Sequence, residues 1–238
     1  MRKINMTGRI LLGACFIAGL FFWPAVCAFS ATSSATESTC PLDGLKFTQS
    51  LPISGTALGM MLDFRQTGAI ASPWPQAECP KDGLVLYKEF TPEEVRALAG
   101  YVLSDAYQAL RQGQAQYWRI AHLQKVLGAP LEERAPTLLK ATWEARPRQY
   151  EEYAKACLAA YQELAAMQED NKEALLMSQL VIGELQRRLK NFDAAKTVFT
   201  ELQNNTACQK VETCRSIVKQ QFRLIERQDA SSEEFKKQ

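Results

Sequence analysis

From Thr91 onward, apolar residues recur at helical spacing. The segment opens with Thr91-Pro92-Glu93-Glu94, where threonine can cap a helix, proline suits its first position and Glu94 can complete a capping box. The apolar positions that follow share one helical face: Val95, Leu98, Ala99, Val102, Ala106 and Leu110. The pattern predicts one helix that continues to residue 110.

Six further helices are expected from the same spacing. One over residues 117–127 ends at Gly128, and one over about residues 131–145 ends near Pro147. We expect Asp170 to cap the fifth helix, and the sixth to follow Asn191, which tolerates the left-handed conformation. The stripes of the fourth and seventh helices are Tyr150, Tyr153, Cys157, Tyr161 and Leu164, and Val211, Cys214, Val218, Phe222 and Ile225.

Short loops between seven helices favour stacked antiparallel hairpins. Gly183, Ala195 and Phe199 have the spacing of the small, small and aromatic positions of a tetratricopeptide repeat. Gln179 and Gln186 occupy positions where large aromatic residues are typical. We therefore predict TPR-like hairpins over residues 91–228, with a generic helical hairpin as the alternative.

Residues 40–90 are rich in glycine and proline and lack helical periodicity, so they predict a small β-rich, ribbon-like module. Residues 29–39 are dominated by serine and threonine and are interpreted as a flexible linker. Residues 229–238 have little to bury and are expected to form a disordered tail. The predicted fold class is α+β, mostly α.

Residues 1–28 have the pattern of a secretory signal peptide. Arg2, Lys3 and Arg9 precede an apolar stretch, and Val26-Cys27-Ala28 offers small residues for cleavage. The prediction is a periplasmic or secreted protein. Two alternatives are an uncleaved inner-membrane anchor over residues 10–28 and a lipoprotein processed at Cys15.

Charge argues against a nucleic-acid partner. The whole chain has a formal net charge of +2, but without the three leader cations it has 25 basic and 26 acidic residues. Such a balance supports neither nucleic acid nor an anionic membrane as a ligand. We expect a protein or peptide partner, with membrane contact only through an uncleaved N-terminal anchor.

A repeated hexapeptide is the most specific motif. Cys40-Pro41-Leu42-Asp43-Gly44-Leu45 recurs as Cys79-Pro80-Lys81-Asp82-Gly83-Leu84, with five of six positions identical. The motif is close to the C-P-x-C-G knuckle of zinc ribbons, with aspartate in place of the second cysteine. Cys40 and Cys79 could form a disulfide, or could hold zinc with Asp43 and Asp82, or could remain thiols.

The chain also resembles an uncharacterised bacterial family, domain of unknown function 2225. The resemblance is carried by CPLDGLKF, SGTALGMMLDFRQTGAI, SPWPQAECPKDGLVLYKEFTPEE and LLKATWEAR. It implies a zinc-ribbon-like module ahead of helical repeats, and no assigned activity. Cys40 and Cys79 match the first knuckle cysteines, whereas Asp43 and Asp82 depart from the second ones.

No catalytic motif accompanies these features. Cys208 and Cys214 form a second disulfide candidate if a helix begins near Val211. Cys157 is interpreted as a buried hydrophobe, and His122 lacks neighbours at ligand spacing. Trp74, between two prolines, either covers the β module or contacts a partner.

The prediction that follows is an exported, non-enzymatic scaffold in the bacterial envelope, without a cofactor, that binds a protein or peptide. The alternative is a thiol-redox or metal-binding module that uses Cys40 and Cys79, with zinc as the metal.

Overall fold

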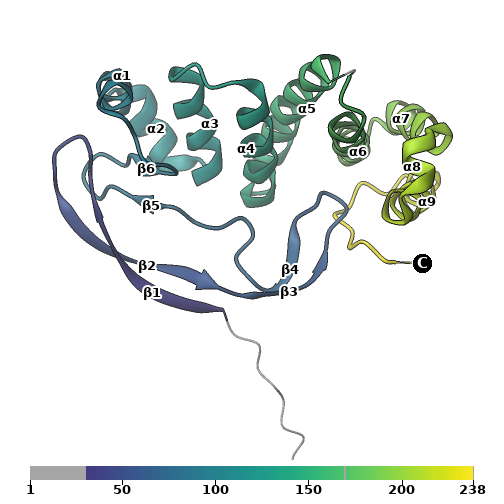
Figure 1. Cartoon of the computed structure of the whole chain (residues 1–238), viewed down its shortest axis with the longest axis horizontal. Helices are drawn as coiled ribbons and strands as arrows, with labels where there is room; N and C mark the ends of the chain where they lie inside the picture. The colour runs from purple at the N-terminus through teal and green to yellow at the C-terminus, as the bar shows by residue number, and fades with distance from the viewer. Residues whose placement is uncertain (1–30, 169, 238) are drawn as a thin grey trace, which may run out of the picture.

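The structure is a computed structural model that describes residues 31–168 and 170–237. Within these residues the chain is α+β and mostly helical, as predicted (Figure 1). The strands come first: β1 (Thr32–Thr39), β2 (Lys46–Ser54), β3 (Thr56–Met60), β4 (Gln66–Ala69), β5 (Ala77–Glu78) and β6 (Val85–Leu86). The helices follow: α1 (Pro92–Val102), α2 (Asp105–Gly113), α3 (Gln116–Val126), α4 (Leu131–Glu144), α5 (Tyr150–Met167), α6 (Lys172–Arg188), α7 (Phe192–Asn204), α8 (Thr206–Lys210) and α9 (Glu212–Glu226).

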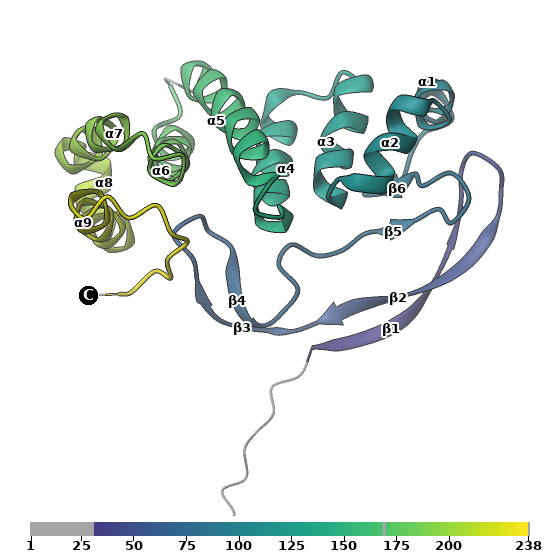
Figure 2. The ribbon, with the colours of Figure 1, turned by 180° about the vertical axis from the view of Figure 1, so that it is seen from behind.

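The helices form a row in chain order, and each of α3 to α6 packs against the helix that follows it (Figures 1 and 2). The capping box at the start of the row is present: the Glu94 amide donates to the Thr91 hydroxyl, and the Thr91 amide donates to the Glu94 carboxylate. The helix start predicted from the capping residues is therefore confirmed.

The prediction of one continuous helix to residue 110 is wrong, because α1 ends at Val102 and α2 begins at Asp105. The chain turns at Ser104, which has an extended backbone and accepts a hydrogen bond from the Tyr107 amide as the cap of α2. The Ser104 hydroxyl also donates to the Tyr101 carbonyl. A serine side chain that bonds nearby backbone groups competes with a continuing helix, so the apolar face is shared by two helices.

Three other helix ends differ from expectation. Asn171, rather than Asp170, caps α6 by accepting a hydrogen bond from the Ala174 amide. Lys190, rather than Asn191, has the left-handed conformation, with φ of 65°. The short helix α8 was not predicted; it begins after Asn205, whose side chain accepts hydrogen bonds from two amides of its first turn.

Helices α6 and α7 approach closely at Gly183. A Cβ atom there would lie 2.6 Å from Cζ of Phe199, which is itself fully buried beside Ala195. The small residue is therefore required by the ring that occupies this space.

Gly183→Ala should lower the free energy of unfolding by about 1–3 kcal/mol, because the added methyl overpacks the α6–α7 contact. The control is Gly100→Ala in α1, where a Cβ meets nothing within 4 Å. There, helix propensity should make alanine neutral or stabilising by up to about 1 kcal/mol. Urea unfolding measures both, and equal effects at the two glycines would contradict the close approach.

The residues from β1 to β6 form an extended strap, defined here as residues 32–86. The strands pair antiparallel as β1 with β2, β3 with β4 and β5 with β6. Figures 1 and 2 show the strap running beneath the row, from the α1 and α2 end toward α9. Residues 32–39, expected to be a linker, instead pair with β2, because their threonines suit a strand and the partner supplies backbone hydrogen bonds.

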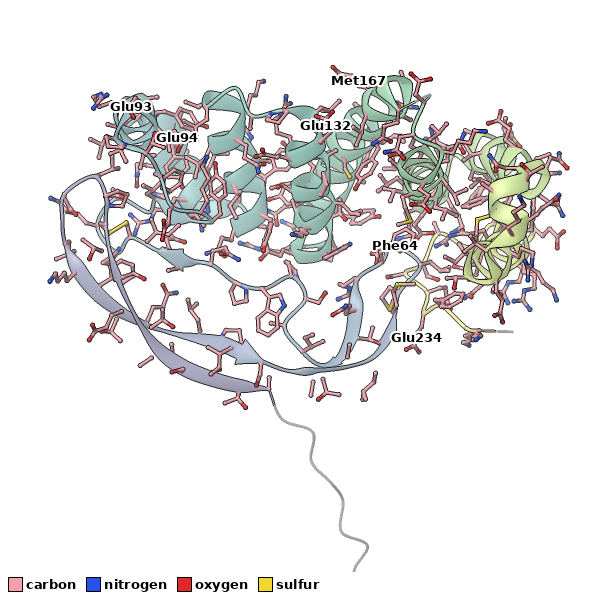
Figure 3. All side chains as sticks on the ribbon, in the orientation of Figure 1. Phe64, Glu93, Glu94, Glu132, Met167 and Glu234 are labelled. Atoms are coloured by element: carbon pink, nitrogen blue, oxygen red, sulfur yellow. A yellow bond between two sulfur atoms is a disulfide. The ribbon has the colours of Figure 1, made fainter. Side chains whose placement is uncertain are left out.

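The residues after α9 are also ordered, contrary to the expected disordered tail. The Leu62 amide donates to the Glu233 carbonyl at 2.9 Å, and the Phe235 amide donates to the Met60 carbonyl at 2.7 Å. We call this pairing of residues 60–62 with 233–235 the clasp. Phe64 and Glu234 mark its two sides in Figure 3, and Phe235 packs onto the core beside it. The tail has a strand partner that its own sequence could not reveal.

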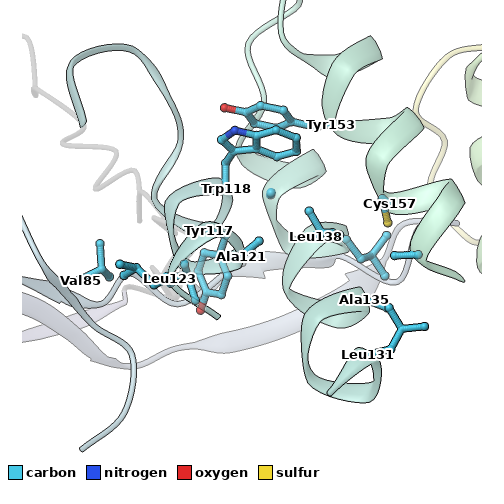
Figure 4. Packing of buried hydrophobic residues seen from close by; sticks show 14 of the residues in the cluster. Val85, Tyr117, Trp118, Ala121, Leu123, Leu131, Ala135, Leu138, Tyr153 and Cys157 are labelled. Atoms are coloured by element: carbon cyan, nitrogen blue, oxygen red, sulfur yellow. The ribbon is translucent and has the colours of Figure 1, made fainter. Parts of the chain in front are cut away.

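Two apolar clusters hold the strap and the helices together. The first joins Cys40, Cys79 and Leu84 of the strap to helices α1 to α6, and includes the stacked rings of Trp118 and Tyr153, 4.1 Å apart (Figure 4). The second joins Leu62 of the strap to α6, α7, α8 and α9. The apolar side chains of residues 40–90 that are buried in these clusters therefore share a core with the helices, whereas Leu45, Ile53 and Leu58 are exposed.

Candidate functional site

The two hexapeptides fold into turns with the same hydrogen bonds. In the first, the Gly44 amide donates to the Cys40 carbonyl at 2.8 Å, and the Cys40 amide donates to the Leu45 carbonyl at 2.9 Å. Gly83, Cys79 and Leu84 repeat both bonds at 2.9 Å. Each glycine has positive φ, 73° at Gly44 and 78° at Gly83, which explains its place in the motif.

The aspartates are part of this turn. Oδ1 of Asp43 accepts a hydrogen bond from the Leu45 amide at 3.0 Å, and Oδ1 of Asp82 accepts one from the Leu84 amide at 2.8 Å. A short acidic side chain that bonds the amide two residues ahead stabilises a turn. Aspartate before glycine thus has a structural role in both copies.

The structure joins Cys40 to Cys79 by a disulfide, with both residues fully buried and their Cα atoms 5.6 Å apart. Of the four predicted zinc ligands, Cys40, Cys79 and Asp82 have ligand atoms within 4.8 Å of one another. Asp43 is not in this group and lies 3.6 Å from the Lys81 ammonium. Zinc requires thiolate sulfur, so the set does not fit the metal while the disulfide is formed.

The second turn is bound to helices α2 and α3. Hydrogen bonds reach four successive carbonyls: Pro80 and Lys81 from Arg111, Asp82 from Gln108, and Gly83 from Tyr107. Beside the turn, Arg119 pairs with Glu78 at 2.6 Å. These helix residues were not predicted, because nothing near them in the sequence identifies partners that lie thirty or so positions earlier. The turn anchors the strap to the helices.

The remaining cysteines divide as their spacing suggested. Cys208 in α8 and Cys214 in α9 form a disulfide with Cα atoms 5.3 Å apart. The bond is possible because the helix is interrupted at Val211, between α8 and α9. Cys157 is free and fully buried, and burial raises the pKa of its thiol well above its usual value. A neutral buried thiol is a poor nucleophile, so Cys157 is a packing residue.

A groove of about 300 Å³ opens between helices α3, α4 and α5. Its walls include the aromatic rings of α3 and three alanines of α5, and charged side chains from all three helices stand at its rim. The residues that line it include Trp118, His122, Lys125, Arg134, Ala159 and Glu163. Each belongs to an ordinary amphipathic helix, so the sequence alone did not single out the groove.

His122 has no catalytic partner there. Its Nδ1 lies 3.3 Å from the Tyr101 hydroxyl, and its ring lies against Trp118. Burial, assisted by the charge of Lys125, lowers the pKa of His122 below its usual 6.5. The side chain is therefore a neutral wall of the groove at neutral pH.

His122 should make stability depend on pH. Folding lowers the pKa of His122. Its contribution to the free energy of unfolding is therefore present above the pKa of the unfolded chain, 6.5, and is lost as the pH falls through the pKa of the folded protein. We expect the urea midpoint of the native protein to drop from about pH 7.5 to about pH 5 more than that of His122→Gln. Parallel curves would contradict this assignment.

Trp74 lies in the strap between β4 and β5. Its carbonyl accepts hydrogen bonds from the Tyr117 hydroxyl at 2.8 Å and from the Gln76 amide group at 3.0 Å, and its side chain is 37% exposed. The backbone is therefore held against α3. A partner contact at Trp74 stays a prediction.

A charged network lies buried near the clasp. Arg187 is fully buried and donates to Glu184 at 2.8 Å and to Gln221 at 2.8 Å. It also donates to the carbonyls of Asp229 at 2.6 Å and Ser231 at 3.0 Å. One arginine thus links α6, α9 and the residues that lead into the clasp.

No family model, curated protein or solved structure matches the chain. The resemblance to domain of unknown function 2225 stays a prediction. Among the described residues, no helix combines the length and apolar character needed to cross a membrane. The predicted signal peptide, the anchor over residues 10–28 and Cys15 lie outside the described residues.

Proposed function

We propose that the protein is an exported, non-enzymatic scaffold that binds a peptide segment of a partner protein in the groove between α3, α4 and α5. The groove itself is the observation that carries the proposal, because it is open, largely apolar and framed by rigid helices. Its neighbours include no nucleophile beside a base, which favours binding over catalysis.

The lining suggests the chemistry of the partner. Ala159 and its neighbouring alanines leave room for a backbone to approach α5, and Trp118 offers an apolar ring at the wall. Lys125 and Arg134 make no ion pair within the described residues, whereas the rim offers one acid, Glu163. A segment with an apolar side chain next to an acidic one would complement this surface.

Export is supported by the cysteines. Four of the five cysteines among the described residues are joined in two disulfides. Disulfides persist in oxidising compartments such as the periplasm or the extracellular space. This agrees with the predicted leader and favours a periplasmic or secreted protein over a cytosolic one.

Selection from a displayed random-peptide library on the intact protein tests the proposal. Peptides that bind the native protein should lose affinity by about tenfold or more on Ala159→Trp, which fills the groove, a loss of about 1.4 kcal/mol. The matched control is Gln162→Trp, an exposed position of α5 that does not line the groove. Its affinity should stay within about twofold of the native protein.

Two results would contradict the proposal. One is a library that yields no enriched peptide. The other is a set of peptides that binds both tryptophan variants equally, which would place recognition elsewhere. Circular dichroism melting of each variant ensures that a loss of binding is not a loss of fold.

A second candidate, thiol-redox or metal chemistry at Cys40 and Cys79, has one observation in its favour. The two sulfurs and the Asp82 carboxylate are close enough to share an ion once the sulfurs are reduced. Burial of both sulfurs weighs against exchange with an outside thiol. Zinc content of the native and reduced protein tests this candidate, and about one equivalent per chain would favour it over the scaffold.

A further inference from the structure

A second, more apolar pocket lies at the far end of the helical row. It has a volume of about 380 Å³ and is lined by α7, α8 and α9, with Val218 and Phe222 among its apolar residues. This volume is within the range of small-molecule sites. The α8–α9 wall is fixed by the Cys208–Cys214 disulfide, so the pocket is preformed rather than a gap between mobile helices.

Three cations stand along one edge of this pocket. Arg215, Lys219 and Arg223 are spaced four residues apart on α9, so they lie on one face of that helix. All three are exposed, and within the described residues no carboxylate lies within 4.0 Å of their charged groups. Of the three, only Arg215 donates a side-chain hydrogen bond to another described residue, the carbonyl of Gln209. The positive charge is therefore available to a ligand.

We propose that this pocket binds a single-chain anionic lipid of the fatty-acid class. The acyl chain would occupy the apolar pocket against Val218 and Phe222, and the carboxylate would lie on the cationic edge. A peptide fits less well: although Gln203 and Gln209 also line the pocket, the surface exposed inside it is mostly apolar, and a buried peptide backbone needs more hydrogen-bond partners than that surface offers. The site is separate from the groove of α3, α4 and α5, so either can fail without the other.

Isothermal titration of the full chain with dodecanoate, kept below its micelle concentration, tests the proposal. We expect saturable binding of dodecanoate and no binding of acetate, which has the head group without the chain. Dodecyltrimethylammonium has the same chain with a positive head and should bind at least about tenfold more weakly, as expected when charge complementarity sets the preference.

Variants assign the binding to this pocket. Lys219→Glu with Arg223→Glu should weaken dodecanoate binding by at least about tenfold. The matched control is Lys172→Glu with Lys196→Glu, which changes net charge equally at exposed positions outside the pocket. Gln203→Trp, which fills the pocket from α7, should also abolish binding, whereas Ala159→Trp should leave it unchanged.

Three results would overturn the proposal. These are no saturable heat with dodecanoate, equal affinity for the cationic chain, and equal loss in the control double variant. The last would mean that net charge alone, rather than the α9 edge, governs binding. Thermal melting of each variant separates unfolding from loss of the site.

Discussion

Arg187→Met should lower the free energy of unfolding by about 3–5 kcal/mol, the usual cost when one partner of a buried ion pair is removed. Glu184 would be left buried with only Gln221 and the more distant Arg188 to stabilise its charge. Burial already raises the pKa of Glu184 above its usual value, even with Arg187 in place. The methionine keeps much of the volume, so the effect reports charge rather than a cavity.

The control is the double variant Glu184→Gln with Arg187→Met, measured in the same urea titration. Removing both charges should recover much of the loss, because no uncompensated ion remains. Hydrogen exchange gives a local readout: the amides of Leu62 and Phe235 should exchange faster in Arg187→Met, since Arg187 holds the carbonyls that lead into the clasp. A single variant that costs less than about 1 kcal/mol would contradict the network.

Cys40→Ser with Cys79→Ser should lower the free energy of unfolding by about 3–4 kcal/mol. The disulfide spans 39 positions, and a cross-link over a longer loop removes more conformational entropy from the unfolded chain. The strap would also lose the covalent link between its two turns, although its second turn keeps the hydrogen bonds from α2 and the one from Arg119 of α3.

The second disulfide is the internal control. The Cys208–Cys214 disulfide closes a loop of only six positions, so its removal in Cys208→Ser with Cys214→Ser should lower the free energy of unfolding by about 2 kcal/mol. Guanidinium unfolding of the two double variants measures the order of the effects. Equal costs would mean that loop length does not govern the contribution of these bridges, and no cost at Cys40 and Cys79 would contradict their bond.

The sequence predicted the elements whose signals are local. The capping box at Thr91 and the apolar stripes of the long helices are determined by residues within a few positions of each other, and these helices are present. The prediction from local pattern was wrong at Ser104, because the same apolar face is compatible with one long helix or with two shorter ones. It was also wrong for residues 32–39 and for the tail, because their partners are distant in the chain.

The candidate sites also divide into features that nearby residues determine and features that depend on residues distant in the chain. Internal repetition identified Cys40 and Cys79, and the repeat proved to have matching turns. The groove of α3, α4 and α5 was missed, because a groove depends on how three helices lie side by side. The cations of α9 are visible in the sequence at helical spacing, but the apolar pocket beside them exists only once α7 and α8 are placed.

The clasp has a consequence for how the chain acquires its structure. A protein made only of stacked helical pairs can begin to fold while its later part is still being synthesised. Here the end of β3 and the residues just after it pair with residues 233–235, which follow α9 along the chain. Closure of the clasp must therefore wait until the residues after α9 have been synthesised, and it joins segments far apart in sequence, a kind of contact that forms slowly in folding.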